Sequence, residues 1–133
     1  MPEGVGYSGS NVVASVGRTF QYIGDRIFGY SGEVGVNNVE TIMFEDKVGS
    51  RYALVNIRFN YIQASDDNFE YFVYLNDVVV QGYQVSAAHL YTGADNGIEL
   101  LIPPFNTLKL SAINLSNSTA LDQIVSVVGK LYK

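Results

Sequence analysis

The chain has 133 residues, enough for one ordinary domain with a hydrophobic core and too few for two β-domains of usual size. It contains no cysteine, no tryptophan and one histidine, so the usual nucleophiles, metal ligands and proton shuttles are scarce. The net charge of −5 and the scattered basic residues argue against nucleic-acid binding, and with only 16% charged residues, uncharged polar side chains must cover much of the surface.

The start of the chain carries no recognisable targeting signal. Residues 1–6, MPEGVG, lack the basic start and the apolar run of a secretion signal. No segment approaches the roughly 20 apolar residues of a membrane span. We therefore expect a soluble chain that is made in the cytoplasm and has no membrane partner.

Residues 1–25 are rich in glycine and serine, and this composition predicts a flexible N-terminal arm. Within the arm, apolar residues recur at a spacing of three to four after Ser10, which also suits a short amphipathic helix capped by Ser10. Either form offers an apolar segment to a neighbouring molecule. The alternative is that the arm folds over its own domain. The residues that we predict to bind a partner are Val13, Val16, Phe20 and Tyr22.

Residues 26–133 predict about eight β-strands, because short β-branched and aromatic segments alternate with Gly, Asn, Asp and Pro. The predicted strands cover residues 26–35, 39–47, 51–63, 69–75, 78–84, 98–102 and 107–112, and a last strand contains Val125, Val127 and Leu131. Segment 51–63 shows the clearest alternation, with Ala53, Val55, Ile57, Phe59 and Tyr61 on one face. Segment 85–90 fits a strand or one helical turn equally well.

Two connections have distinctive chemistry. Asn76 and Asp77 tolerate a positive φ and predict a tight hairpin between segments 69–75 and 78–84. Pro103 and Pro104 cannot donate to a strand ladder and predict an extended corner after residue 102.

The predicted fold is an all-β, antiparallel two-sheet sandwich that resembles a jelly roll. No long helix is predicted in residues 26–133, so the strands must bury their apolar faces against one another. An immunoglobulin-like Greek key stays open as an alternative, although the cysteine pair and tryptophan of that family are missing.

Catalysis finds little support in the sequence. His89 follows Ser86 closely, and Asp66 or Asp95 could orient its ring, but no nucleophile-elbow pattern surrounds a serine. The glutamates show no recognisable pairing for glycoside hydrolysis; they are Glu40, Glu45, Glu70 and Glu99. We therefore expect a protein that is not an enzyme.

Acidic residues gather in two predicted loops, at 66–68 and at 95–96. Their oxygens could hold calcium if the loops met, but neither loop has the spaced ligands of a known calcium motif. Solvated turn residues are the simpler interpretation, and we expect no metal ion and no cofactor.

Ten tyrosines are spread through the predicted strands and their ends. Some aromatic side chains must face outward, because Phe69, Tyr71, Phe72 and Tyr74 cannot all point to one face of a strand. Exposed tyrosines suit protein interfaces and sugar-stacking surfaces, whereas high β-propensity alone is the alternative explanation.

Three short segments resemble small β-sandwich virion proteins of bacteriophages. They are YIGD at 22–25, GYSG at 29–32 and IPPF at 102–105, which leads on to Asn114. The resemblance implies a capsid decoration or cement protein, or a minor capsid component, located in the virion. It further implies a homotrimer whose arm reaches a capsid or other virion protein. A carbohydrate- or receptor-binding β-sandwich module is the alternative.

Overall fold

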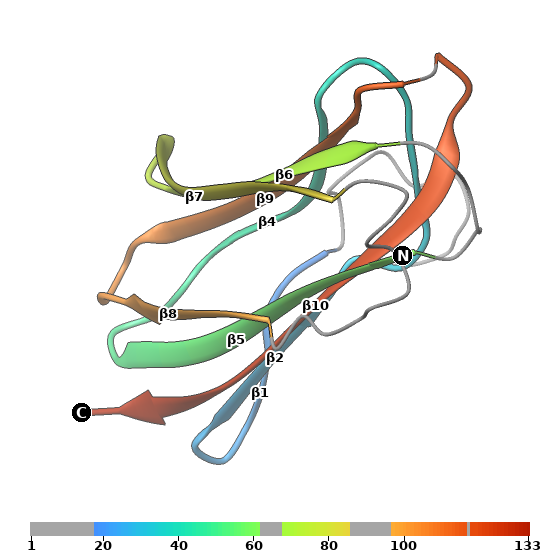
Figure 1. The fold of residues 1–133 in the computed structure, drawn as a ribbon. Helices are drawn as coiled ribbons and strands as arrows, with labels where there is room; N and C mark the ends of the chain where they lie inside the picture. The colour runs from blue at the N-terminus through green and yellow to red at the C-terminus, as the bar shows by residue number, and fades with distance from the viewer. Residues whose placement is uncertain (1–17, 62–67, 86–96, 117) are drawn as a thin grey trace.

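The computed structural model describes residues 18–61, 68–85, 97–116 and 118–133. All regular structure in these ranges is β, and ten strands form two antiparallel sheets that pack face to face (Figure 1). The prediction of an all-β two-sheet sandwich is therefore confirmed. The strands are β1 Gln21–Ile23, β2 Arg26–Tyr30, β3 Val34–Val36, β4 Thr41–Lys47, β5 Tyr52–Tyr61, β6 Phe69–Leu75, β7 Val78–Val85, β8 Ile98–Ile102, β9 Thr107–Asn114 and β10 Leu121–Tyr132.

The two sheets differ in size. The larger one, called sheet A below, has the strand order β1-β2-β10-β5-β8, with β3 also paired to β10. The smaller one, called sheet B, has the order β4-β9-β6-β7. In Figure 1 sheet B is the upper layer and sheet A the lower layer.

The strand pairs are nested around the β6–β7 hairpin. β6 pairs with β7, β5 with β8, β4 with β9, and β2 with β10, so each pair encloses the previous one along the chain. Successive pairs fall alternately in sheet B and sheet A. This arrangement is a jelly roll of eight strands. The short strands β1 and β3 are additions to the jelly roll, and they explain why the structure has ten strands where about eight were predicted.

The hydrophobic core lies between the sheets, where the predicted alternation is confirmed. On β5, Ala53, Val55, Ile57 and Phe59 are buried, and their neighbours on the strand are more exposed. The inward faces of the other central strands are also buried: Phe69, Tyr71 and Val73 on β6, Leu108, Leu110 and Ala112 on β9, and Val125, Val127 and Leu131 on β10. On β6, Phe72 and Tyr74 are more exposed, which agrees with the prediction that some aromatic side chains of this strand face outward.

One buried polar contact joins the two sheets. The Tyr71 hydroxyl on β6 donates to Oε1 of Gln123 on β10 over 2.8 Å, and Gln123 has no exposed surface. The ring of Phe59 stacks on Tyr71 with centroids 4.4 Å apart. Because a buried amide without a partner would cost on the order of 1–3 kcal/mol, this pair fixes how β6 lies over β10.

The predicted hairpin is confirmed, since Asn76 and Asp77 have φ angles of 51° and 68°, which make the tight β6–β7 turn. Pro103 and Pro104 lie at the predicted place between β8 and β9, but the corner is a turn and is not extended. The Asn106 N–H donates to the Pro103 carbonyl over 3.3 Å and closes it.

The predicted strand at 26–35 is interrupted. Ser31 leaves the strand, and Gly32 takes a φ of 69° before β3 begins. Ser31 still binds β10, because its N–H donates to the Val125 carbonyl and its Oγ accepts from the Val125 N–H. The serine hydroxyl therefore replaces a backbone carbonyl at the bend between β2 and β3.

The boundary of the predicted arm at residue 25 is wrong. β1 pairs antiparallel with β2, and Phe20 is only 5% exposed, with its ring 5.0 Å from that of Phe44. The sandwich thus begins by Phe20, because strand pairing and burial of a large aromatic ring hold this segment against the body. Residues 21–23 are a strand, not the end of a helix. Residues 1–17 lie outside the described residues, so the arm stays a prediction for them.

A substitution at Gly129 tests how closely β10 packs against β5. A Cβ at this position would lie 2.3 Å from the Leu54 carbonyl oxygen and 2.8 Å from the Val55 Cα, both of which belong to the β5 backbone. We expect Gly129→Ala to lower the free energy of unfolding by about 1–3 kcal/mol, measured by urea denaturation, because β5 cannot yield without disturbing its pairing. Gly49→Ala is the control, since nothing lies within 4 Å of its Cβ position. Equal losses in the two variants would contradict the prediction.

Candidate functional site

The residues predicted from chemistry alone do not assemble into a described catalytic or metal site. Within the described ranges, no three His, Cys, Asp or Glu side chains are placed to hold a metal ion. These ranges also contain no helix long and apolar enough to cross a membrane. His89, Ser86, and the acidic residues at 66–67 and 95 fall outside the described residues. Glu99 belongs to sheet A, whereas Glu45 and Glu70 belong to sheet B, so these three do not line one cleft.

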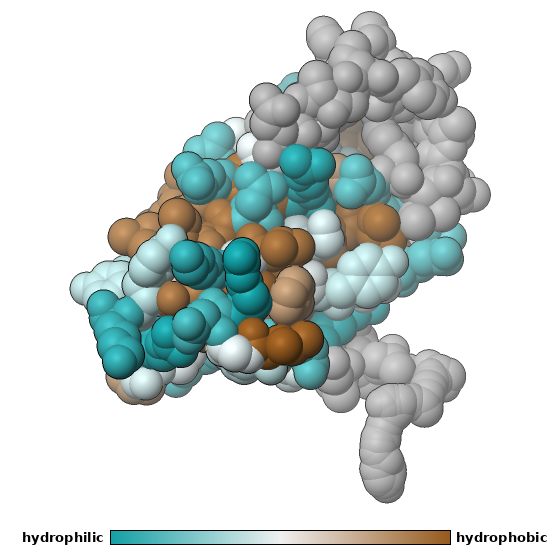
Figure 2. Space-filling view, turned by 90° about the horizontal axis from the view of Figure 1, so that it is seen from below, coloured by the Kyte–Doolittle hydropathy of each residue, from teal (hydrophilic) through white to brown (hydrophobic). Residues whose placement is uncertain are grey.

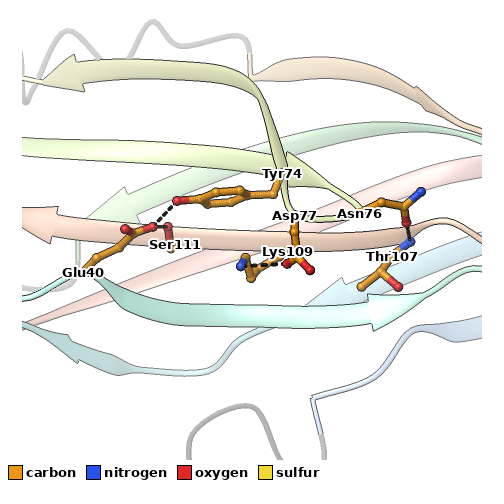
Figure 3. Close-up of polar contacts among 7 residues, drawn as sticks. All are labelled: Glu40, Tyr74, Asn76, Asp77, Thr107, Lys109 and Ser111. Atoms are coloured by element: carbon orange, nitrogen blue, oxygen red, sulfur yellow. Dashed lines mark hydrogen bonds and ion pairs between the residues drawn. The ribbon is translucent and has the colours of Figure 1, made fainter.

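A polar cluster lies on the outer face of sheet B, in the region drawn in Figure 3. One carboxylate oxygen of Glu40 accepts hydrogen bonds from the Tyr74 hydroxyl and from the Ser111 hydroxyl, both over 2.5 Å (Figure 3). The hydrogen bond to Glu40 is the main cause that raises the pKa of Tyr74 above its ordinary value. Ser111 has no exposed surface, so a substrate cannot reach its hydroxyl. The cluster therefore joins β6 and β9 to the segment before β4.

Lys109 extends this cluster toward the β6–β7 turn. Its Nζ lies 3.0 Å from Oδ1 of Asp77 and 4.3 Å from the centroid of the Tyr74 ring (Figure 3). Asp77 is largely exposed, and an exposed ion pair stabilises a fold by only about 0–1 kcal/mol. The contact orients the turn and adds little to stability.

Three connections of the chain are tied together at one end of the sandwich. The Asn76 side chain donates to Oδ1 of Asn106 over 2.6 Å. It also accepts from the Thr107 N–H over 2.8 Å (Figure 3). The Val48 N–H donates to the Asn106 carbonyl, and the Phe105 N–H donates to the Gly49 carbonyl. These bonds join the β4–β5, β6–β7 and β8–β9 connections into one unit. We call this unit the tip; it comprises Val48, Gly49, Asn76, Asp77 and residues 103–106.

Phe105 is the most unusual residue of the tip. Its φ is 62°, and its side chain is 63% exposed. A bulky residue in the left-handed region is strained, and such strain persists only where the surroundings hold it. Here Nδ2 of Asn106 donates to the carbonyls of Pro103 and Pro104, which fixes the chain on both sides of the ring. An exposed aromatic side chain on a rigid support is suited to anchoring a partner.

Sequence reasoning identified the diproline corner but missed Phe105. An aromatic residue directly after two prolines in a predicted turn is a signal that could have drawn attention to it. The turn itself is local, because the Asn106 N–H donates to the Pro103 carbonyl over 3.3 Å and places Phe105 after a proline, where some turns require a positive φ. The contact of the Phe105 N–H with the Gly49 carbonyl is distant in the sequence and could not be read from it.

The outer face of sheet A has a shallow depression of about 400 Å³ lined by Asn56, Arg58, Ser126 and Val128. Ser126 pairs with Tyr30 on β2 and with Arg58 on β5, so a small side chain lies between two long ones. Nε of Arg58 donates to Oδ1 of Asn56 over 3.2 Å, and Tyr30 is 59% exposed. Figure 2 shows this face of the molecule, where hydrophobic side chains are interspersed among hydrophilic ones.

The four predicted partner-binding residues differ in how far the structure leaves them accessible. Phe20 is buried in the core, so it stabilises the sandwich, and contacting a partner would require it to leave Phe44. Tyr22 is 47% exposed on β1 and is accessible to a partner. Val13 and Val16 lie outside the described residues.

The backbone strain at Phe105 can be tested by comparing two substitutions. Phe105→Gly removes the ring and relieves the positive φ, so we expect the free energy of unfolding to be unchanged or to rise by up to about 1 kcal/mol. Phe105→Ala removes the ring and keeps the strain, and we expect it to be the less stable variant. Urea denaturation of both variants checks this order. A glycine variant less stable than the alanine variant would show that the backbone is not strained at this position.

Comparisons with known proteins give no relative from which a function could be transferred. No protein-family model, no curated protein and no solved structure matches the chain. The features of the described residues that could bind a partner are the tip, the depression on sheet A and the edges of the two sheets.

Proposed function

We propose that the chain is a non-enzymatic structural protein of a virion, which decorates or cements a capsid or is a minor capsid component. The observation that carries the proposal is Phe105, an exposed aromatic side chain that the tip holds at a strained φ. A preformed anchor of this kind lowers the entropic cost of binding another protein. The jelly-roll pairing adds support, because capsid domains are among the proteins that use this fold. Fold alone does not carry the function, since lectins use it too.

The proposal includes self-association and an arm. The resemblance to phage virion proteins implies a homotrimer in which the N-terminal segment reaches neighbouring capsid or virion subunits. Because β1 and Phe20 belong to the sandwich, this role is assigned to residues 1–17, together with the exposed Tyr22. The low charge of the chain fits extensive protein contact, since charged residues are depleted at the centres of interfaces.

Deletion of residues 1–17 tests the arm. We expect the truncated protein to remain folded, because it keeps Phe20 and β1, and to bind particles more weakly. Binding is measured by cosedimentation with capsids of the encoding virus that lack this protein, and folding by thermal denaturation. Deletion of residues 1–25 is the comparison, and it should also lower the melting temperature because it removes Phe20 and β1. Undiminished binding of the chain that lacks residues 1–17 would refute a role for the arm.

A carbohydrate-binding module is the second candidate, favoured by the depression on sheet A. Asn56, Arg58 and Ser126 provide side chains that can hydrogen-bond hydroxyl groups, and Tyr30 in the same row offers a ring for stacking. We expect wild-type protein to bind members of a glycan array under this hypothesis, and Ser126→Leu to abolish that binding by filling the depression. Capsid attachment of Ser126→Leu should be unchanged if the virion proposal holds. An array without hits would count against the module.

A further inference from the structure

One edge strand of the sandwich differs from the others in the described part of the chain. The edges of sheet A are β1 and β8, and those of sheet B are β4 and β7. β4 contains Glu45, Asp46 and Lys47, and β8 contains Glu99. β1 has three residues, and so does β3, which pairs only with β10. β7 has eight residues, VVVQGYQV, without a charge or a proline.

β7 is also exposed along most of its length. Val78, Val79 and Val80 are 62%, 52% and 42% exposed, and Gln81, Gly82 and Gln84 are exposed as well. Sheet edges are usually protected by charged residues, proline or bulges, since an open edge can pair with another chain. β7 has one such device, a bulge where its register against Val73 and Tyr74 shifts. Three adjacent exposed valines remain on a strand that is otherwise suited to pairing.

We propose that β7 is an interface between two copies of this chain, paired antiparallel about a two-fold axis. An unpaired strand edge is complementary to the same edge of a second copy, because each can supply the backbone partners that the other lacks. Each chain carries a net charge of −5, so the local repulsion between two copies is smallest where an uncharged edge meets its equal. A two-fold contact brings a patch against the same patch, so the acidic residues of β4 or β8 would face their own copies. A contact between two copies of β7 avoids this repulsion, because the strand has no charged residue.

The strand also indicates the register of the contact. The described exposed residues of β7 run from Val78 to Gln84, with Gln81 at the midpoint. Antiparallel pairing of this segment with itself therefore places Gln81 opposite Gln81 and Val78 opposite Gln84. The contact joins the two four-stranded B sheets into one continuous sheet of eight strands. It goes beyond the proposed function, because it assigns a surface and a symmetry to self-association. If trimers form through another surface, the β7 contact joins them in pairs.

A charge placed on the axis tests the contact. Light scattering over a dilution series should give wild-type particles with an even multiple of the 14.6 kDa chain mass. We expect Gln81→Lys to weaken this association at least about tenfold, because two like charges then face one another on the axis. Gln21→Lys is the matched control, since it places the same charge on an exposed glutamine of edge strand β1. A monomeric wild type, or Gln81→Lys that associates like the wild type, would overturn the proposal.

Cross-linking tests the register independently of charge. The chain has no cysteine, so Gln81→Cys introduces a single thiol on β7. Residues directly opposite in an antiparallel pair have Cα atoms about 4.5–5.5 Å apart, a distance that a disulfide spans. Mild oxidation should therefore link most Gln81→Cys chains into dimers and leave Gln21→Cys chains single. Failure of Gln81→Cys to cross-link, or equal cross-linking of both variants, would refute the two-fold pairing.

Discussion

The pairing of β5 with β10 is the contact on which the rest of the sandwich depends. It runs from Gln123 opposite Tyr61 to Tyr132 opposite Tyr52, and β10 binds β2 and β3 along its other edge. The same two strands supply much of the core, and β10 carries Gln123, which is bound to Tyr71 of sheet B. Gly129 permits the close approach of the two strands, since any side chain there would meet the β5 backbone. Sheet A is thus built around one long pair, and sheet B is placed over it by buried contacts.

This framework explains how the molecule can hold a strained residue at its end. The three connections of the tip each join strands whose pairing is already set, so the hydrogen bonds of Asn76 and Asn106 link preformed elements. Little further entropy is lost when they close, and the positive φ of Phe105 is maintained. Exposed apolar side chains are found on the tip, on the edge strand β7 and among the tyrosines of sheet A, as well as at Ile23 and Val39.

Such a surface fits the role in assembly that we propose for this protein. Some of the described polar residues join strands, as Glu40 does for Tyr74 and Ser111. Phe105 and the valines at 78–80 are exposed to solvent instead. A structural virion protein would use Phe105 of the tip to contact partners and β7 to contact its own copy. A glycan-binding module would instead use the depression beside Tyr30.

Much of the fold could be predicted from local chemistry. The alternation of β5, the Asn76–Asp77 turn and the diproline corner depend on the two-residue period of a strand and on the φ preferences of individual residues. Partner-binding residues were harder to predict, because exposure is not a local property. Phe20 has the same apolar character as a binding residue, and only the position of Phe44 across the sandwich decides that it is buried.

By itself, then, the sequence determined the all-β class, the inward faces of the central strands and the shortage of catalytic groups. The tertiary structure alone decided the nested strand order, the inclusion of β1 in the sandwich, the contact of Phe105 with Gly49 and, among the described strands, the place of β7 at an edge of sheet B. The physical reason is the same in each case. These features arise from contacts between segments far apart in the chain, such as Phe105 with Gly49 and Tyr71 with Gln123, and no local pattern encodes which segments will meet.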